Sequence, residues 1–379
     1  MNVRRAIGVA AVMVLAATVA RSGHELPVYP SYYPHEIEIA AMAPERAAEL
    51  MRAGKLHAYV GGPAVLAAAP DDKIGMVESL GAFVVVRLNP DSPHARNETS
   101  ACAATTAIAR DMAARAGSSG FVAHPYPVTP FHGDYLVHAD RAETARDRIL
   151  AGDAASLPGD LKVRAVGLGR SLVRPGWLSN GTWDAAIEEV SAAGLVADAT
   201  VALNGWLGPR WARSGWFQAY RLLGDASDVA RKQEREALVA RLQTVGYESS
   251  VERLNLEREL VGMLVSACRT TVVGYTLKRE QFNAEFSAGI ENISFDALEG
   301  FRSPMFLRTV KLKDFPWNGW LQLGVREPPT SAWNPIAGFT DPFGRLMWFA
   351  VADPAAIPSP YEAAWTLNRI SEVEASPKR

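Results

Sequence analysis

The stretch from Ala43 to Pro90 changes its hydrophobic period several times, and turn-forming residues stand at each change. Apolar residues first recur at helical spacing, and Gly54 ends that pattern. An apolar run from Leu56 to Val60 then reads as a strand that leads into Gly61, Gly62 and Pro63. A short helix and a second strand, around Phe83 to Arg87, are expected next. The stretch therefore predicts an α/β unit with a glycine-rich strand end.

The end of this predicted strand is a candidate binding position. Open α/β sheets hold ligands at the carboxyl ends of their strands, because backbone N–H groups and a helix N-terminus converge there. Gly62 would let a ligand approach the backbone closely, and Pro63 suits the first turn of a following helix. The alternative is that Gly-Gly-Pro forms a tight turn and nothing more. Residue spacing alone does not separate the two interpretations.

Two runs, RAGKLHAYVGGPAVL and ESLGAFVVVRLNPDSP, resemble the first lobe of periplasmic solute-binding proteins, particularly the phosphate and phosphonate-binding receptors of ABC transporters. The resemblance covers about residues 28–195. It implies a two-lobed α/β fold, here with an additional helical, Trp-rich C-terminal half. It also implies that Tyr59 to Pro63 touch the ligand, and that Thr99 and Ser100 begin a helix that holds an anion. Glu98 adjoins that helix start, and its carboxylate would repel an anionic ligand.

The pattern divides the chain into four regions. Residues 1–20 are a signal peptide, 21–90 begin the first α/β lobe, 91–200 form the second lobe, and 201–379 are a helical and aromatic-rich region that would complete the first lobe. The alternation of elements favours a sheet covered by helices. The helices expected after residue 90 are Thr99–Ala116, Arg141–Ala151, Trp183–Ala193, Ser227–Leu242 and Ser250–Val273, with a strand at Leu161–Val166.

The first twenty residues have the order of a secretory signal peptide. Arg4 and Arg5 precede an apolar run from Ala6 to Ala20, and polar residues follow it. This run is shorter than the ~20 residues that span a bilayer. We therefore expect cleavage near Ala20 and a soluble, periplasmic protein. In that oxidising compartment the two cysteines, Cys102 and Cys268, either form one disulfide or remain two buried thiols.

Composition and missing motifs exclude several function classes. A formal charge of −2, from 39 basic and 41 acidic residues, provides no basic field for nucleic acid. The sequence contains no C-x-x-C, no C-x-x-C-H and no G-x-S-x-G, and the glycines at 167 and 169 lack the third glycine of a dinucleotide fingerprint. We expect no cofactor, and we expect a binding protein rather than an enzyme.

The segment GFVAHPYPVTPFHGDYLVHADR carries three prolines in six residues. A long proline-rich loop inside a compact domain is usually functional. The loop would line a cleft, so that His132 and Tyr135 meet Gly61 and Gly62 across it, or these residues would only fasten the loop to its own domain. A second alternative is a metal site in a periplasmic enzyme or an envelope accessory protein. Its candidate ligands are His124, His132 and His138, joined by Asp134 and Asp140, although their spacing matches no compact metal motif.

Ten tryptophans add large aromatic area, which suits both cores and ligand pockets. The sequence therefore predicts a solute-binding-like protein that captures a small organic ligand, apolar or aromatic, in an interlobe cleft. The partner would be an inner-membrane transporter or a periplasmic protein. A structural partner of an envelope complex, with the Trp-rich half as its interface, is the third hypothesis. The expected ligand-binding residues are Tyr59, Gly61, Gly62, Pro63, Thr99, Ser100, Tyr126, His132 and Tyr135.

Overall fold

The computed structural model describes residues 34, 36–66, 73–117, 120–150, 160–201, 209–226, 231–314, 319–332, 339, 341–351, 355–368 and 371–372. The predicted signal peptide, residues 1–20, lies outside this part of the chain. Within it, no helix combines the length and the apolar character that crossing a membrane requires.

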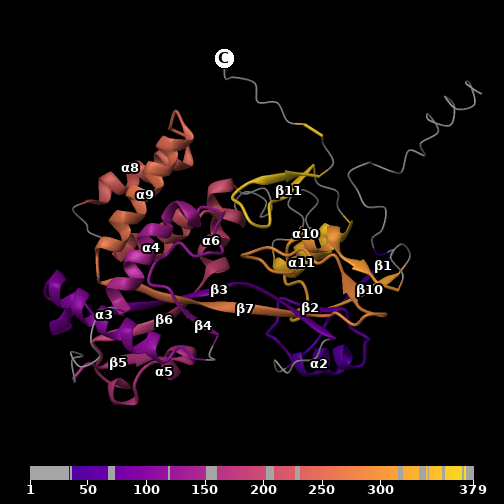
Figure 1. The fold of residues 1–379 in the computed structure, drawn as a ribbon, viewed down its shortest axis with the longest axis horizontal. Coiled ribbons are helices and arrows are strands. Elements are labelled where there is room, and N and C mark those ends of the chain that lie inside the picture. The colour runs from indigo at the N-terminus through magenta and orange to yellow at the C-terminus, as the bar shows by residue number, and fades with distance from the viewer. Residues whose placement is uncertain are drawn as a thin grey trace, which may run out of the picture.

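Two lobes lie side by side, and two long strands run through both of them (Figure 1). These strands are β3 (Ile74–Leu88) and β7 (Thr270–Asn283), which pair antiparallel along nearly their whole length. The pairing shifts register between Leu80 and Phe83, where the strands pass from one lobe to the other. The sheet has the order β1-β10-β2-β7-β3-β6-β5, and β4 also pairs with β7. The predicted two-lobed α/β fold is confirmed.

The first lobe combines the beginning of the chain with its end. Strands β1 (Glu36–Ala41), β10 (Trp320–Val325) and β2 (Ala58–Val60) run parallel and extend the sheet beyond β7. Helix α2 (Pro44–Arg52) covers one face, and α10 (Pro304–Thr309) and α11 (Pro342–Val351) cover the other (Figure 1). Two small ribbons complete it: β8 (Ile290–Glu291) with β9 (Lys311–Leu312), and β11 (Ala356–Pro358) with β12 (Trp365–Leu367).

The second lobe is built on the other half of β3. Its run Phe83-Val84-Val85-Val86 is fully buried because each face of the strand enters a different core. Val84 and Val86 pack with α3 (Glu98–Ala114) and α5 (Gly167–Leu172), whereas Phe83 and Val85 pack with the helices of the opposite face. Those helices are α4 (Tyr135–Leu150), α6 (Ala192–Val201), α7 (Gly215–Leu223), α8 (Lys232–Gln243) and α9 (Ser250–Ser266).

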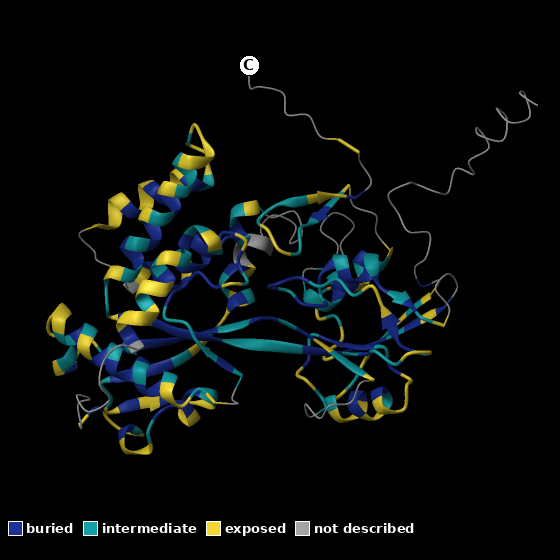
Figure 2. Ribbon diagram, viewed as in Figure 1, coloured by how far each residue is buried: buried dark blue, intermediate teal, exposed yellow. Residues whose placement is uncertain are grey.

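Shorter elements complete this lobe. Strands β4 (Phe121–Ala123), β5 (Val163–Ala165) and β6 (Ala185–Ser191) belong to the sheet. Short 3₁₀ turns connect the larger elements: η1 (Pro93–Ala95), η3 (Pro175–Trp177), η4 (Arg210–Arg213) and η5 (Gly224–Ala226). Figure 2 shows buried strands between helices whose outer faces are exposed.

Three expected helices were wrong in whole or in part. The helix expected over 183–193 is instead strand β6, because its residues pair with β3 on one side and β5 on the other. Tertiary pairing overrides the helical preference of its alanines and glutamates. The helix expected to reach Val273 ends at Ser266, and the β-branched run from Thr270 to Val273 begins β7. The short helix expected after Pro63 is also missing over residues 61–66.

The region 201–379 divides differently from the expectation. Its helices α7, α8 and α9 pack on the core of the second lobe, where Trp216 and Phe217 are buried. The residues after β7 complete the first lobe, including β10, which lies between β1 and β2. The boundary between the lobes therefore falls within β7, because this strand pairs with β4 of the second lobe over Gly274–Thr276 and with β2 of the first lobe at Phe282.

A disulfide joins Cys102 on α3 to Cys268, which lies between α9 and β7. The two Cα atoms are 4.9 Å apart, and 166 positions of sequence separate them. Both cysteines belong to the second lobe, so the bond closes a loop that contains most of that lobe. The alternative of two buried thiols is thereby excluded.

Candidate functional site in the cleft between the lobes

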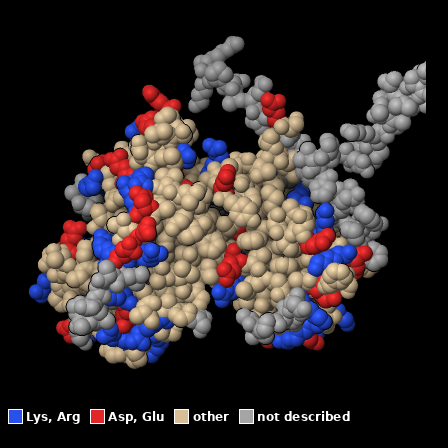
Figure 3. Space-filling model, in the orientation of Figure 1, with Lys and Arg blue, Asp and Glu red and all other residues tan. Residues whose placement is uncertain are grey.

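A cleft lies where the two lobes meet. The second lobe contributes residues of α6, η4 and α7, and the first lobe contributes residues 296–304, α11 and the β11–β12 ribbon. In Figure 3 the surface is hollowed along the line between the lobes. The free volume of the cleft is about 70 Å³.

The lining of the cleft combines cations with apolar surface. Four arginines contribute to it, two from each lobe, together with two carboxylates of the first lobe. Leu298, Phe349 and Trp365 provide apolar area between the charged groups. The charged residues are Arg210, Arg213, Arg302, Arg345, Asp296 and Glu299.

An ion pair crosses the cleft. Arg213 of the second lobe donates to the Asp296 carboxylate of the first lobe over 2.5 Å. The Asp296 side chain is fully buried and also accepts the backbone N–H groups of Leu298 and Glu299 at 2.8 and 2.9 Å. Burial raises the pKa of Asp296, and the Arg213 guanidinium opposes that shift. Leu298 packs into the core of the second lobe, so this turn fastens the two lobes together.

Three N–H groups around the cleft are buried and have no hydrogen-bond partner among the described residues. They are Nε2 of Gln218, Nε of Arg213 and Nε of Arg302. A buried donor left unpaired costs about 1–3 kcal/mol, and native proteins rarely keep several together. All three groups are donors, and they come from both lobes. The cleft is therefore suited to a ligand that brings acceptor oxygens.

The predicted residue His132 lies one layer behind this cleft. Its Nδ1 accepts the backbone N–H of Thr129 at 3.0 Å, so Nε2 carries the proton and donates to Oε1 of Gln218 at 3.1 Å. Burial lowers the pKa of His132, which favours this neutral imidazole. The bond holds Oε1 of Gln218 on the histidine and leaves its Nε2 for the cleft. His132 thus positions the amide of Gln218, which lines the cleft.

Sequence reasoning missed Gln218, although a signal was present. The buried face of α7 includes Trp216, Ala219, Leu222 and Leu223. Gln218 precedes Leu222 by four residues and so lies on the same apolar face, where it is fully buried. A polar amide on such a face needs a partner in the interior.

The predicted strand end lies outside the cleft, and one of its residues lies beside a residue that lines the cleft. Gly61 lies beside Arg302, in a neighbouring hollow that also contains Phe343, and its N–H donates to Glu280 at 2.6 Å. Gly62 is covered by the ring of Tyr59, whose hydroxyl donates to the Met42 carbonyl at 3.0 Å. Pro63 is exposed. The expectation that Gly62 admits a ligand gives way to a packing role, because the Tyr59 ring occupies that space.

Substituting Gly62 with alanine is expected to lower the free energy of unfolding by about 1–3 kcal/mol, as overpacking does. A Cβ at this position would lie 2.1 Å from Cε1 of Tyr59, so the ring must move. Urea unfolding measures the loss. Gly176→Ala is the control, since no atom lies within 4 Å of a Cβ built there. Equal stability of the two variants would contradict the packing role.

The other predicted residues do not line the cleft. Thr99 and Ser100 lie in the first turn of α3, and the Ser100 N–H donates to the Asn97 side chain at 2.8 Å. Helix α3 lies at the end of the second lobe that is farther from the first lobe (Figure 1). Tyr126 is buried in the second lobe, and Tyr135 packs beside His124 at a ring separation of 5.9 Å. Tyr126 and Tyr135 thus fasten the proline-rich segment to its own lobe, whereas Gly133 of the same segment lies against the backbone of residues 361–363 of the first lobe.

The three predicted histidines do not form a common centre in the described part of the chain. Nε2 of His124 donates to the Val128 carbonyl at 2.9 Å, and both nitrogens of His132 are engaged as described above. His138 instead meets Asp134 and Glu257. Glu257 lies on α9, more than a hundred residues away in sequence.

No family model and no curated protein matches this chain. Among solved structures it aligns with HbpA2 from Haemophilus parasuis, at TM-score 0.41 and 14% identity over 72% of this chain and 56% of that one. It aligns with DppA from Helicobacter pylori in complex with the peptide STSA at TM-score 0.40 and 11% identity, over 70% and 54%. It aligns with AgaA from A. tumefaciens R10 in complex with agropinic acid at TM-score 0.38 and 11% identity, over 71% of this chain and 58% of that one.

The chain thus spans little more than half the length of each of these proteins. Similarity at this level does not transfer a ligand or a partner. The two ligands named, a peptide and agropinic acid, are neither phosphate nor phosphonate.

Proposed function

We propose that this protein is an exported solute-binding protein that captures a small organic ligand with a carboxylate group in the cleft between its lobes. The unpaired N–H donors of Gln218, Arg213 and Arg302 carry the proposal. A carboxylate supplies several acceptor lone pairs and matches the planar fork of an arginine. The ligand would then pass to an inner-membrane transporter or a periplasmic partner.

The remaining lining sets the character of the rest of the ligand. Leu298, Phe349 and Trp365 offer apolar and aromatic surface beside the donors. A pocket of this kind binds an apolar body and orients it through a few polar groups. This lining supports the proposal that the ligand also carries an apolar or aromatic body.

The connection between the lobes supports a hinge. Strands β3 and β7 carry the chain between the lobes, and their pairing is irregular from Leu80 to Phe83. Such irregularities bend a strand locally. Opening at this hinge would widen the cleft for ligand entry, and closing would enclose the ligand between the lobes. The signal-peptide pattern and the Cys102–Cys268 disulfide support export to an oxidising compartment.

Gln218→Glu is expected to weaken carboxylate binding by about 10- to 100-fold, because like charges brought together cost a few kcal/mol. The variant keeps an oxygen that accepts the His132 proton, so the contact with His132 is preserved. The N–H group of Gln218 is replaced by a carboxylate oxygen. Native mass spectrometry of gently purified protein first identifies any retained molecule. Calorimetry with that molecule, and with benzoate, succinate and glutamate as probes, then compares the variants.

Gln233→Glu is the matched control, since Gln233 is exposed on α8. It should bind the probes as the unchanged protein does. Unchanged affinity in the Gln218 variant would show that this amide does not bind a carboxylate in the cleft. The absence of any retained or bound carboxylate would count against the proposed function itself.

A further inference from the structure

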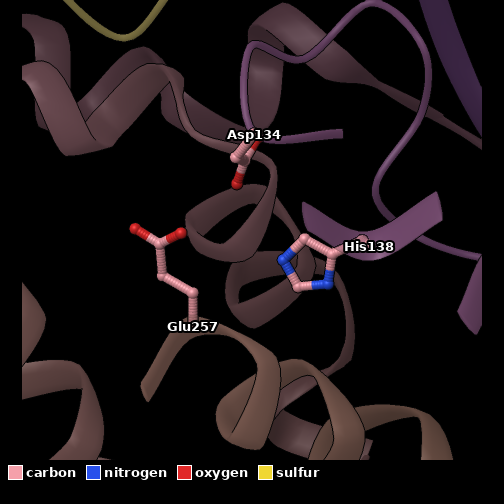
Figure 4. Close-up of side chains that lie close together, drawn as sticks. All are labelled: Asp134, His138 and Glu257. Atoms are coloured by element: carbon pink, nitrogen blue, oxygen red, sulfur yellow. The ribbon is translucent and has the colours of Figure 1, made fainter. Parts of the chain in front are cut away.

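Asp134, His138 and Glu257 converge inside the second lobe, with one potential ligand atom of each within 4.8 Å of the others. Figure 4 shows the two carboxylates and a ring nitrogen of His138 directed toward a common point. We propose that this cluster is a binding site for a divalent metal ion of the zinc type. The proposal is independent of the cleft, which these residues do not line.

Burial and missing partners carry the argument. His138 is 0% exposed, Glu257 is 1% and Asp134 is 9%. Nε2 of His138 and Oε2 of Glu257 have no hydrogen-bond partner among the described residues. Buried acceptors of this kind are normally paired, and two lone pairs facing each other cannot satisfy one another. A cation between them satisfies both.

The other atoms of the three side chains are already held. The Tyr126 hydroxyl lies 3.1 Å from Nδ1 of His138. In the tautomer with its proton on Nδ1, His138 donates to that oxygen and keeps the Nε2 lone pair for a metal. Arg253 donates to Oε1 of Glu257 at 3.0 Å. The backbone N–H groups of Gly215 and Trp216 donate to Asp134 at 2.9 and 3.2 Å. These contacts fix the orientation of each ligand before a metal arrives.

The fold explains how the site is assembled. Asp134 immediately precedes α4 and His138 lies within its first turn, so their spacing of four residues puts them on the same side. Helix α9 brings Glu257 opposite them, and the N-terminus of α7 lies against Asp134. Three helices therefore converge on the cluster.

The chemistry of the ligand set selects the metal class. Two carboxylates and a neutral imidazole provide two negative charges, which a dication compensates. Ca²⁺ and Mg²⁺ prefer oxygen ligands throughout, whereas a set of nitrogen and oxygen ligands suits Zn²⁺ and its neighbours. Three protein ligands leave one tetrahedral position, which water can occupy.

The test uses the full chain without a histidine tag. Elemental analysis of protein purified without chelator measures any metal retained, and titration with Zn²⁺ and Co²⁺ measures affinity. We expect saturable binding of a single equivalent, with a Co²⁺ absorption spectrum that differs from that of the aqueous ion. Tyr126→Phe removes the contact that orients His138, and it is expected to weaken metal binding by roughly 10- to 100-fold. His138→Gln and Glu257→Gln each remove a ligand itself, so each should weaken binding by at least that factor.

His124→Gln is the control, because His124 belongs to the same segment but lies outside the cluster. It should bind metal with the affinity of the unchanged protein. Circular dichroism verifies that each variant is folded, and if His138→Gln is not, Tyr126→Phe and the Co²⁺ spectrum decide. No saturable binding by the unchanged protein, or equal affinity of the folded His138 and His124 variants, would overturn the site. Loss of carboxylate binding in the cleft would leave this result unaffected.

Discussion

Replacing Cys102 and Cys268 together with serine is expected to lower the free energy of unfolding by about 2–5 kcal/mol, the range found when a native disulfide is removed. The bond spans 166 sequence positions. Without it, the unfolded chain regains the conformational freedom that closure of this long loop had removed. The bond also ties α3, on one face of the sheet, to the turn between α9 and β7.

Urea unfolding of the double variant, compared with the unchanged protein, measures this effect. Treating the unchanged protein with a reductant should reproduce the loss, and the same reductant should leave the double variant unaffected. The single variants Cys102→Ser and Cys268→Ser should each lose as much stability as the pair, because either change removes the bond. A double variant as stable as the unchanged protein would show that the bond contributes little to stability.

Arg213→Met is expected to lower the free energy of unfolding by about 3–5 kcal/mol, because it leaves the fully buried Asp296 carboxylate without its cation. The variant keeps the turn in which Asp296 accepts the N–H groups of Leu298 and Glu299, so it isolates the contact between the lobes. Since this pair fastens the lobes to each other, its loss should also increase the fraction of open molecules. Small-angle X-ray scattering should then give a larger radius of gyration.

The exposed pair between Arg46 and Glu49 on α2 is the matched control, with both side chains more than half exposed. Arg46→Met should lower the free energy of unfolding by less than about 1 kcal/mol, because exposed ion pairs contribute little to stability. An Arg213 variant with an equally small cost and an unchanged scattering profile would contradict the role of this pair in holding the lobes. Asp296→Ala, which removes the turn as well, should lose at least as much stability as Arg213→Met.

The candidate site was predictable only in part from the sequence. The proline-rich segment does lead to the cleft, but through His132, which supports Gln218 from behind. Gly61 lies beside Arg302, whereas Gly62 is occupied by the Tyr59 ring. Arginines 213 and 302 carried no local signal, because a surface cation and a cation that lines a cleft look the same along a chain. Their meeting depends on how the lobes pack.

Local pattern by itself determined the α/β class and several elements, whereas the two-lobed fold was implied by the resemblance to periplasmic solute-binding proteins. The apolar run around Phe83 to Arg87 predicted a strand, which is found within β3, and the helix expected from Thr99 is found as α3. These features depend on neighbours within a few residues, which sequence displays directly.

Only the tertiary structure decided that residues 185–191 form a strand, that Cys102 bonds Cys268, and that Glu257 meets His138. Each of these results depends on residues brought together by folding. The alanines and glutamates of β6 favour a helix until β3 and β5 offer hydrogen bonds on both sides. The residue pattern within β6 or α9 does not indicate which distant segment it will contact. The stabilising energy arises only when the two segments meet.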